Sequence, residues 1–595
     1  MAVSSVQKEI ATYYSSRPPT NYMPLGSEPA CDEQRTLKKM TFGQNVVHKY
    51  AYEHLAAPGN RRGLLVWHST GTGKTCAAAG IMDAFAHTDK NMFYITTFQG
   101  LRSNNSASFM QCAEGLFPRL ATDMTSNPGR YHFTTIRKFA NAVSGREFSP
   151  NSEVLRRKEA LESSVVILDE IHKLFDPKAL DGPFYREAQA FLRDMRNRHP
   201  DIVVVLMTAT PGRTVSELCD LLTMIRDPDE PEVSFADPES FAQQVQGLVS
   251  YIDMSHDHNI FPAVVETDEE VEMGEQQARA YQERLAKDDL TGCRKYCNSL
   301  YLKKPGMLWE QFSSKSVAIC DKIQATVGAK HYVYSCFYEN RGTGGHGIRG
   351  LAALLQEKGY TQLRPSDVAG ITKQAVRAMP SAKRFIVLTN RDVSDGSESE
   401  KVEADNLRAL LTVFNHSTNS DGRLVQVVLA SQGYNESVDL HAVQYVHLME
   451  PQLNFLDEIQ AIGRAVRRCS HKDLPRKNRL VHVIRYLACK SVQDEARSLK
   501  KLNADLELLS FLHGLGKVTQ RELDEATRRL SDAWAKLIEF QTTDHIVRHH
   551  AVANYALMKR ALDIVKASAV DCMVTSSYHG AAPPCLQQPG APTKN

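Results

Sequence analysis

The chain has 595 residues, 42% of them hydrophobic and 24% charged, and this composition excludes a largely disordered protein. Its 71 Lys and Arg nearly balance its 69 Asp and Glu, so the formal charge of +2 excludes a nonspecific basic nucleic-acid binder. No run of about 18 apolar residues appears, and the first residues form no apolar segment, so we expect neither a membrane-spanning helix nor a secretion signal.

The predicted elements begin with a mixed N-terminal segment, residues 1–55. An apolar run at 63–67 then leads through a glycine-rich turn into a helical pattern. Three further strand-like runs follow at residues 92–96, 164–168 and 202–207. Helical patterns such as 185–196 alternate with them, and this alternation predicts a parallel sheet covered by helices on both faces over residues 56–228.

The next segment, residues 229–329, is predicted to be a mainly helical insertion. An acidic cluster between Glu266 and Glu275 precedes a polar helical pattern at 276–287. The charges are interpreted as a solvated face. Cys293 and Cys297 form the one close cysteine pair, and without a second pair at metal-ligand spacing they are interpreted as two thiols on one helix face.

A second α/β series is predicted over residues 330–490. Its strand-like runs are residues 331–336, 385–389, 425–429, 445–448 and 480–486. The glycine-rich turn 341–347 is interpreted as a flexible loop in preference to a phosphate-binding nest. The segment 491–575 is predicted to be helical and charged, and residues 576–595 to be a disordered tail.

The twelve cysteines are scattered along the chain. Most have apolar or mixed surroundings, as at Cys76, Cys219 and Cys489. This usage predicts buried free thiols in a reducing compartment.

The strongest chemical signal is the turn Ser69-Thr70-Gly71-Thr72-Gly73-Lys74-Thr75 between a strand and a helix. Glycines let backbone N–H groups wrap a phosphate, and the helix N-terminus adds positive potential. Lys74 is expected to neutralise the β- and γ-phosphates of a nucleotide, and the Thr75 hydroxyl to hold Mg²⁺. The strict pattern has glycine six positions before Lys74, where this chain has His68.

A second signal is the apolar run 165–168, which ends in Asp169 and Glu170. Asp169 is expected to hold Mg²⁺, directly or through water, and Glu170 to orient and polarise the attacking water. A strand capped by a solvated acidic pair is the alternative. The preceding phosphate loop favours the catalytic interpretation.

Two further motifs carry polar groups. The run 203–211 ends in Thr208 and Thr210, whose hydroxyls could bond to the acidic pair and sense the state of the nucleotide. The run 460–468 places Arg464 and Arg467 three residues apart, which predicts that they share one helix face. Arginines aimed at a γ-phosphate stabilise charge in the transition state.

In order and spacing, HSTGTGKT, LDEIH, TATP and QAIGRAVR resemble motifs I, II, III and VI of superfamily 2 helicases and translocases. The resemblance implies an α/β fold of two RecA-like parallel-sheet domains with ATP bound between them. It assigns a DExH box completed by His172, coupling residues Thr208 and Thr210, and an adenine-reading Gln44. The residues that it implies for ATP and Mg²⁺ are Gln44, Ser69, Thr70, Gly71, Thr72, Gly73, Lys74, Thr75, Asp169, Glu170, Gln460, Arg464 and Arg467.

Further segments resemble the helicase-like ATPases of large nucleocytoplasmic DNA viruses, a group that includes nucleoside triphosphatase I and the small subunit of the poxvirus early transcription factor. The segments are residues 67–68, 247–251, 261–262, 429–431, 436–440, 447–451, 454, 468–471 and 569–572. The resemblance implies a DNA-dependent ATPase that moves on DNA in viral transcription. It also implies a viral RNA polymerase or transcription-factor partner, and a place in the virion and host cytoplasm or viral factory.

Local charge is compatible with nucleic acid, since residues 456–501 hold twelve Lys and Arg against five Asp and Glu. The resemblance adds a backbone contact from residues 97–104. Two alternatives remain open: an RNA helicase, and a polymerase- or promoter-associated binding factor that uses ATP as a conformational switch.

Overall fold

The computed structural model describes most of the chain. The described residues are 5–16, 22–23, 31, 39–57, 62–69, 71–96, 99–136, 138–139, 163–171, 190, 192–194, 196–197, 199, 201–227, 229–337, 345–389, 400–431, 438–490, 519, 521–522, 525, 528, 541–575 and 585. Among these residues no helix combines the length and the apolar character needed to cross a membrane. The predicted helix at 185–196 and the predicted tail lie largely outside the described residues.

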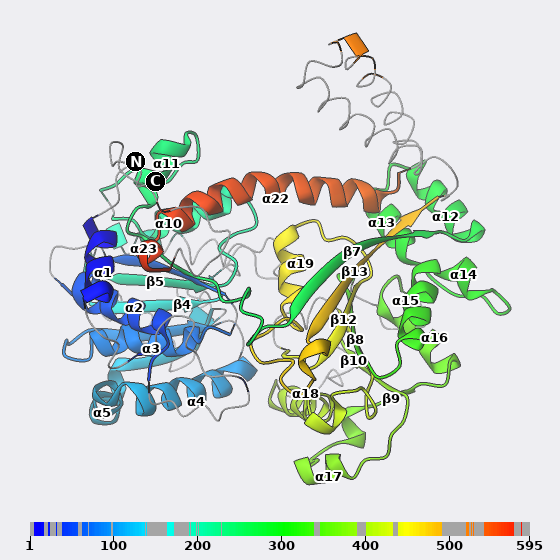
Figure 1. Cartoon of the computed structure of the whole chain (residues 1–595), viewed down its shortest axis with the longest axis horizontal. Coiled ribbons are helices and arrows are strands. Elements are labelled where there is room, and N and C mark those ends of the chain that lie inside the picture. The colour runs from blue at the N-terminus through cyan, green and yellow to red at the C-terminus, as the bar shows by residue number, and fades with distance from the viewer. Residues whose placement is uncertain are drawn as a thin grey trace. The chain divides into compact units, whose positions relative to one another are not determined.

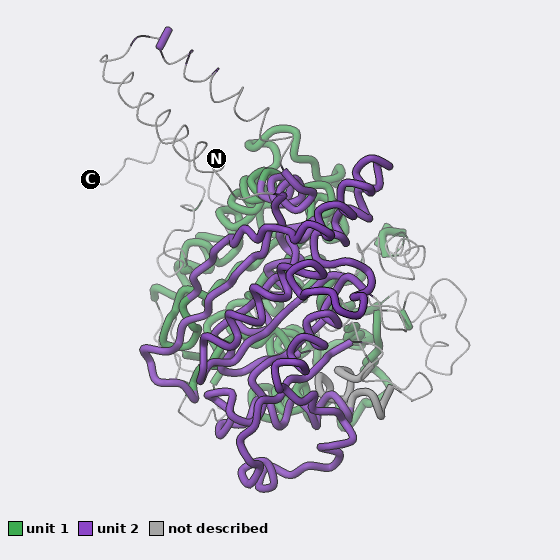
Figure 2. The backbone as a smooth tube through the Cα atoms, turned by 90° about the vertical axis from the view of Figure 1, so that its right-hand side faces the viewer, with its two compact units in different colours: residues 1–263, 467–472, 553–595 green, residues 264–466, 473–552 purple. Residues whose placement is uncertain are grey.

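The chain divides into two compact units, drawn in different colours in Figure 2. Unit 1 comprises residues 1–263, 467–472 and 553–595, and unit 2 comprises residues 264–466 and 473–552. Unit 1 therefore continues past the predicted boundary at 228 and takes in two later segments. The helix α22 (Thr543–Ala567) contributes its first ten residues to unit 2 and the rest to unit 1.

Unit 1 is built on a six-stranded sheet in the order β3-β2-β4-β5-β1-β6, and every neighbouring pair in it is parallel (Figure 1). Its strands are β1 (Gly63–His68), β2 (Asn91–Thr96), β3 (Tyr131–Thr135), β4 (Ser164–Asp169), β5 (Val203–Thr208) and β6 (Val249–Ile252). Every residue of β1, β4, β5 and β6 is buried, as expected of a parallel sheet with both faces covered.

Helices and turns surround this sheet. They are α1 (Ser5–Ser16), α2 (Phe42–Tyr50), a π-helical turn (Ala51–Leu55), α3 (Lys74–Ala84), α4 (Gln99–Leu116), α5 (Pro118–Ser126), α10 (Val215–Ile225), α11 (Pro238–Val245) and α23 (Cys572–Thr575). The C-terminal part of α22 belongs to the core, since Met558, Leu562 and Val565 are buried in one apolar cluster with Leu65 and Leu206.

Unit 2 contains a seven-stranded sheet in the order β7-β13-β12-β8-β11-β10-β9. The strands are β7 (Ala263–Glu272), β8 (Lys330–Ser335), β9 (Thr361–Gln362), β10 (Arg384–Leu388), β11 (Val427–Ser431), β12 (Val443–Leu448) and β13 (Leu480–Cys489). The six strands from β13 to β9 pair in parallel. Its helices are α12 (Glu275–Leu285), α13 (Leu290–Asn298), α14 (Trp309–Phe312), α15 (Ser314–Ala325), α16 (Ile348–Glu357), α17 (Lys373–Arg377), α18 (Glu400–Phe414) and α19 (Phe455–Ile462).

The predicted α/β class and two parallel sheets are confirmed, and each predicted strand coincides with an observed one within a few residues. The stretch 229–329, predicted to be mainly helical, also contains β6 and β7. The four-residue β6 pairs with β1, and the largely exposed β7 carries charges on both faces, so neither shows a buried-strand pattern in sequence. Cys293 and Cys297 both lie buried on α13, as predicted.

The prediction of free thiols was wrong for half of the cysteines. Three disulfides join Cys31 to Cys469, Cys76 to Cys112, and Cys572 to Cys585. The first spans 438 residues of sequence with its Cα atoms 5.3 Å apart. Only the tertiary fold brings such partners within bonding geometry, so spacing along the chain carries no trace of them.

Candidate nucleotide site

The glycine-rich turn follows the carboxyl end of β1 and leads into α3, as predicted. Gly71 and Gly73 have φ of 80° and 86°, in the left-handed region that favours glycine. Gly73 is the N-cap of α3, so the backbone N–H groups at the start of the helix face the loop. Ligands of open α/β sheets bind at the carboxyl ends of the strands, where this loop lies.

Several hydrogen bonds hold this loop in place. Ser69 N donates to Ile252 O at 2.9 Å, and Ser69 Oγ accepts from Met254 N at 3.2 Å. Lys74 Nζ donates to His68 O at 3.3 Å, which holds the ammonium group over the loop. Thr70 lies outside the described residues.

Gln44 contacts the loop directly. Its side-chain Nε2 donates to Gly73 O at 3.2 Å, and its Oε1 accepts from Thr41 N at 2.9 Å within a capping box at the start of α2. A Cβ on Gly73 would lie 2.4 Å from Gln44 Nε2, so the two residues are closely packed. The structure thus brings the predicted Gln44 to the phosphate loop.

The acidic pair lies at the carboxyl end of β4. Asp169 pairs there with Met207, near the end of the neighbouring strand β5. Glu170 has φ of 55°, an uncommon conformation for a residue with a side chain, and its N–H donates to Asp169 Oδ1 at 3.0 Å. Strained backbone of this kind clusters at functional sites, where the surrounding fold maintains it. His172 lies outside the described residues.

Tyr94 is a site residue that the sequence interpretation missed. It is buried on β2, and its hydroxyl donates to Asp169 Oδ2 at 2.7 Å. The Thr75 side chain lowers the pKa of the same phenol, so Tyr94 interacts with both residues predicted to hold Mg²⁺. Its place on a neighbouring strand could be read from the sequence, but the partner of its hydroxyl could not.

The charges of the site are strongly perturbed. Burial and the adjacent Glu170 raise the pKa of Asp169 to about 6, while Lys74 and the Tyr94 hydrogen bond act in the opposite direction. Burial and Asp169 raise the pKa of Tyr94 well above its usual value. A buried carboxyl group beside a second carboxyl group is an arrangement that a cation stabilises.

Thr208 and Thr210 bond to one another at the end of β5. Thr208 Oγ1 accepts from Thr210 N and donates to Thr210 O, both at 3.0 Å. Trp67, which pairs with Thr208 in the sheet, donates from Nε1 to Ala209 O at 3.1 Å. These bonds make the motif a rigid turn next to the acidic strand.

The predicted arginine helix ends earlier than expected. Helix α19 stops at Ile462, and Arg464 N bonds to Ala461 O in a tighter turn, so Arg464 and Arg467 do not share a helix face. Gly463 at the C-cap, a poor helix former, marks the end. Gln460 and Arg464 belong to unit 2, whereas Arg467 belongs to unit 1.

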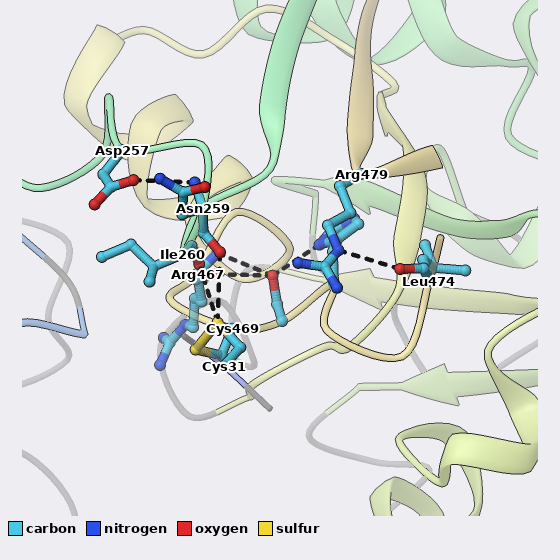
Figure 3. The surroundings of a disulfide bond; sticks show 10 residues. Cys31, Asp257, Asn259, Ile260, Arg467, Cys469, Leu474 and Arg479 are labelled. Carbon is cyan, nitrogen blue, oxygen red and sulfur yellow. Dashed lines mark hydrogen bonds between the residues drawn. A yellow bond between two sulfur atoms is a disulfide. The ribbon is translucent and has the colours of Figure 1, made fainter. Parts of the chain in front are cut away.

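The segment 467–472 is bound tightly within unit 1. Cys469 N donates to Ile260 O at 2.7 Å, and its sulfur is joined to Cys31 (Figure 3). The adjacent Arg468 packs on the phosphate loop, since a Cβ on Gly71 would lie 2.8 Å from Arg468 Cβ. Unit 1 thus contains the loop, the acidic pair, the threonine turn and two arginines.

Comparison with known proteins agrees with this geometry. Residues 34–213 match the family model described as "Type III restriction enzyme, res subunit". The matched region contains the phosphate loop, the acidic pair and the threonine turn.

Three curated relatives extend the similarity along the chain. A putative helicase of Invertebrate iridescent virus 3 is 25% identical over 70% of this chain and 46% of its own length. A putative ATP-dependent RNA helicase of Acanthamoeba polyphaga mimivirus is 24% identical over 77% of this chain and 85% of its own length. A termination factor NPH-I homolog of African swine fever virus is 22% identical over 72% of this chain and 70% of its own length. The chain spans about half the length of the first of these.

The chain thus combines two units built on parallel sheets with a glycine-rich loop and an acidic pair at the strand ends of unit 1, and it is similar to putative helicases of large DNA viruses. Residues 34–213 are similar to the res subunit of type III restriction enzymes, and one relative is described as a termination factor homolog.

Proposed function

We propose that the chain hydrolyses ATP in a nucleic-acid-dependent reaction and uses the energy to move along DNA during viral transcription. The observation that carries the proposal is the convergence of Lys74, Thr75, Asp169 and Glu170 at the carboxyl ends of β1 and β4, which flank β5 in one sheet, with Tyr94 bonded to Asp169. This is the arrangement that phosphoryl transfer needs, because its catalysis is mostly positioning and charge stabilisation.

Each residue has a proposed role. The loop N–H groups and Lys74 bind the phosphates, and Glu170 orients the attacking water. Arg467 and Arg464 supply positive charge to the γ-phosphate, and Gln460 supports them. Gln44 supports the loop at Gly73 and contributes to nucleotide recognition.

The donor set fits a magnesium ion. Thr75 offers a hydroxyl and Asp169 a buried carboxylate, both oxygen ligands, and the carboxyl pair lies where a divalent cation relieves repulsion. Bound Mg²⁺ would neutralise charge that develops on the phosphates.

The relatives support a role in transcription, because one of them is described as a termination factor homolog. We propose a viral RNA polymerase or another transcription-factor subunit as the partner, and the virion and the viral factory in the host cytoplasm as the location. Exposed Lys472, Arg476 and Lys477 lie in the basic segment 456–501 and suit contacts with a phosphate backbone. Arg485 does not contribute, because it is buried among carboxylates.

The decisive experiment is ATP turnover by the full chain, measured separately with single-stranded DNA, double-stranded DNA and RNA. Lys74→Ala and Glu170→Gln should each lower kcat by about 10²-fold or more, since they remove phosphate binding and water activation. Lys90→Ala and Glu239→Gln are matched controls, because Lys90 bonds to Asp201 O at the opposite end of the strands and Glu239 is exposed on α11. Unchanged turnover in either site variant contradicts the assignment.

A second candidate, an RNA helicase, is favoured by the description of the mimivirus relative as an ATP-dependent RNA helicase. Turnover that RNA stimulates and DNA does not would select it. A polymerase-associated switch would instead leave the polymerase complex intact in Glu170→Gln.

A further inference from the structure

We propose that Asp571 is a positioning residue for the phosphate loop and acts through a buried hydrogen-bond relay, Asp571–Ser250–His68. The proposal rests on the proposed nucleotide-binding function of that loop. It assigns a role to two motifs that the nucleotide site does not use, residues 247–251 and 569–572, and to the histidine that replaces a glycine in the phosphate-loop pattern.

The relay joins three distant parts of the chain within unit 1. Ser250 Oγ on β6 donates to Asp571 Oδ2 at 2.5 Å, and it lies 2.9 Å from His68 Nε2 at the end of β1. All three residues are at most 2% exposed. Hydrogen bonds in such surroundings are stronger than in water, and leaving one unmade is costly.

Backbone bonds hold the carboxylate in this position. Asp571 Oδ1 accepts from Tyr251 N at 3.0 Å, and the preceding Val570 N donates to Val249 O at 2.7 Å. Gln7 of α1 donates from Nε2 to Ala569 O at 2.7 Å. The segment that carries Asp571 is therefore bound on both sides to the sheet and to the N-terminal helix.

The other end of the relay lies at the first residue before the loop. His68 O accepts from Lys74 Nζ, and the next residue, Ser69, bonds through its N–H to Ile252 on β6. The His68 ring is enclosed by α2, because its Cε1 lies 3.4 Å from the position of a Cβ on Gly43. Holding this side chain therefore fixes the backbone from which the loop and Lys74 extend.

The direction of the hydrogen bonds follows from the carboxylate. An ionised Asp571 can only accept, so the Ser250 hydroxyl donates to it, and the Ser250 oxygen is left to accept from His68 Nε2. In Asp571→Asn the amide Nδ2 donates to Ser250 instead. The serine proton then points toward His68 Nε2, so the relay is reversed and the His68 ring must change its tautomer or turn away, which disturbs the backbone that it holds.

The test uses the full chain and the variants Ser250→Ala, His68→Gly and Asp571→Asn. We expect the Kd for a fluorescent ADP analogue without nucleic acid, and the KM for ATP, to rise about ten-fold, because a small misplacement of binding groups is costly. The kcat should change less than the KM, since the loop binds substrate and transition state alike. Amide hydrogen exchange of residues 71–75 should be faster in each variant.

Ser568→Ala is the matched control, since its buried hydroxyl bonds only within α22, to Ile564 O, and not to the relay. All measurements are made well below the melting temperature of each variant. If Ser250→Ala or His68→Gly does not fold, the isosteric Asp571→Asn still tests the proposal. Wild-type Kd, KM and exchange rates in Asp571→Asn and Ser250→Ala would overturn the proposal. A wild-type chain that binds no nucleotide would instead overturn the proposed function.

Discussion

At the scale of single residues, the buried ionisable groups divide into those that belong to the proposed nucleotide site and those that hold the fold. Asp169 and Asp571 both lie in unit 1. Burial makes their carboxyl groups more difficult to ionise and raises the pKa of each to about 6. In unit 2 the buried Arg485 bonds to Glu458, Glu266 and Asp268. Each of these groups has a measurable signature.

Asp571 should make the stability of unit 1 depend on pH. Its pKa rises from 3.8 in the unfolded chain to about 6 in the fold, so it stabilises the fold at low pH and this contribution is lost as pH rises toward 6. The unfolding free energy of Asp571→Asn minus that of the wild type should increase by about 2 kcal/mol as the pH rises from about 4.5 to about 7.5. Urea denaturation at several pH values measures this difference. A difference that stays constant with pH would contradict the prediction.

Arg485 should be among the most sensitive side chains of unit 2. Arg485→Met leaves the Glu458 carboxyl, which is 1% exposed, with the more distant Arg548 at 3.8 Å as its remaining cation, so unfolding free energy should fall by about 3 kcal/mol. The double variant Arg485→Met/Glu458→Met removes this carboxyl group and should recover part of the loss. Chemical denaturation of the single and double variants tests this, and a double variant less stable than the single one would refute the explanation.

At the scale of secondary structure elements, helix α3 connects the proposed nucleotide site to the core of unit 1. It begins in the phosphate loop, and the Cys76–Cys112 disulfide joins it to α4, with Cα atoms 5.2 Å apart. The capping box of α2 brings Gln44 to the same loop. Helix α2 therefore supports the loop through Gln44, and the disulfide to α4 holds the helix α3 that follows the loop.

Breaking this disulfide should destabilise unit 1. Cys112→Ser opens a link between residues 36 apart in sequence and should lower the unfolding free energy by about 3 kcal/mol under non-reducing conditions. With a reductant present, variant and wild type should become equal. Cys320→Ser is the control, since Cys320 is a buried free thiol and its effect should not depend on the reductant. Equal stability of Cys112→Ser and wild type without reductant would show that the bond does not form.

At the scale of the whole molecule, unit 1 is assembled from segments that are far apart in the chain. Unit 1 needs residues after 552, because Met558, Leu562 and Val565 fill its apolar core. Helix α22 is a single element that contributes to both units. The C-terminal region is thus part of the fold of unit 1 and not an appended module.

Truncation tests this assembly. A chain ending at Val552 should fail to fold unit 1, because loss of even one such apolar side chain costs about 2–5 kcal/mol and a domain has only about 5–15 kcal/mol. A chain ending at Thr575 should fold. Near-ultraviolet circular dichroism and Trp67 fluorescence report the difference, since Lys566 Nζ lies 5.3 Å from the Trp67 ring. A soluble, cooperatively melting unit 1 in the shorter chain would contradict this.

Much of the protein could be predicted from the sequence alone because the signals are local. The turn from β1 to α3 and the acidic end of β4 each lie within a few consecutive residues, and the apolar strand runs indicate a doubly covered parallel sheet. The resemblance to superfamily 2 helicases rests on these motifs. The roles of Lys74, Asp169 and Glu170 remain predictions for the turnover experiment.

Only the tertiary structure decided which distant residues meet. Tyr94 reaches Asp169 across neighbouring strands, Ser250 meets Asp571 across 321 residues, and Cys31 meets Cys469 across 438. Helix α19 ended before Arg464, although the spacing predicted a continuous helix. Such partners are selected by sheet order and core packing, which depend on the whole fold and leave no periodic pattern in the sequence.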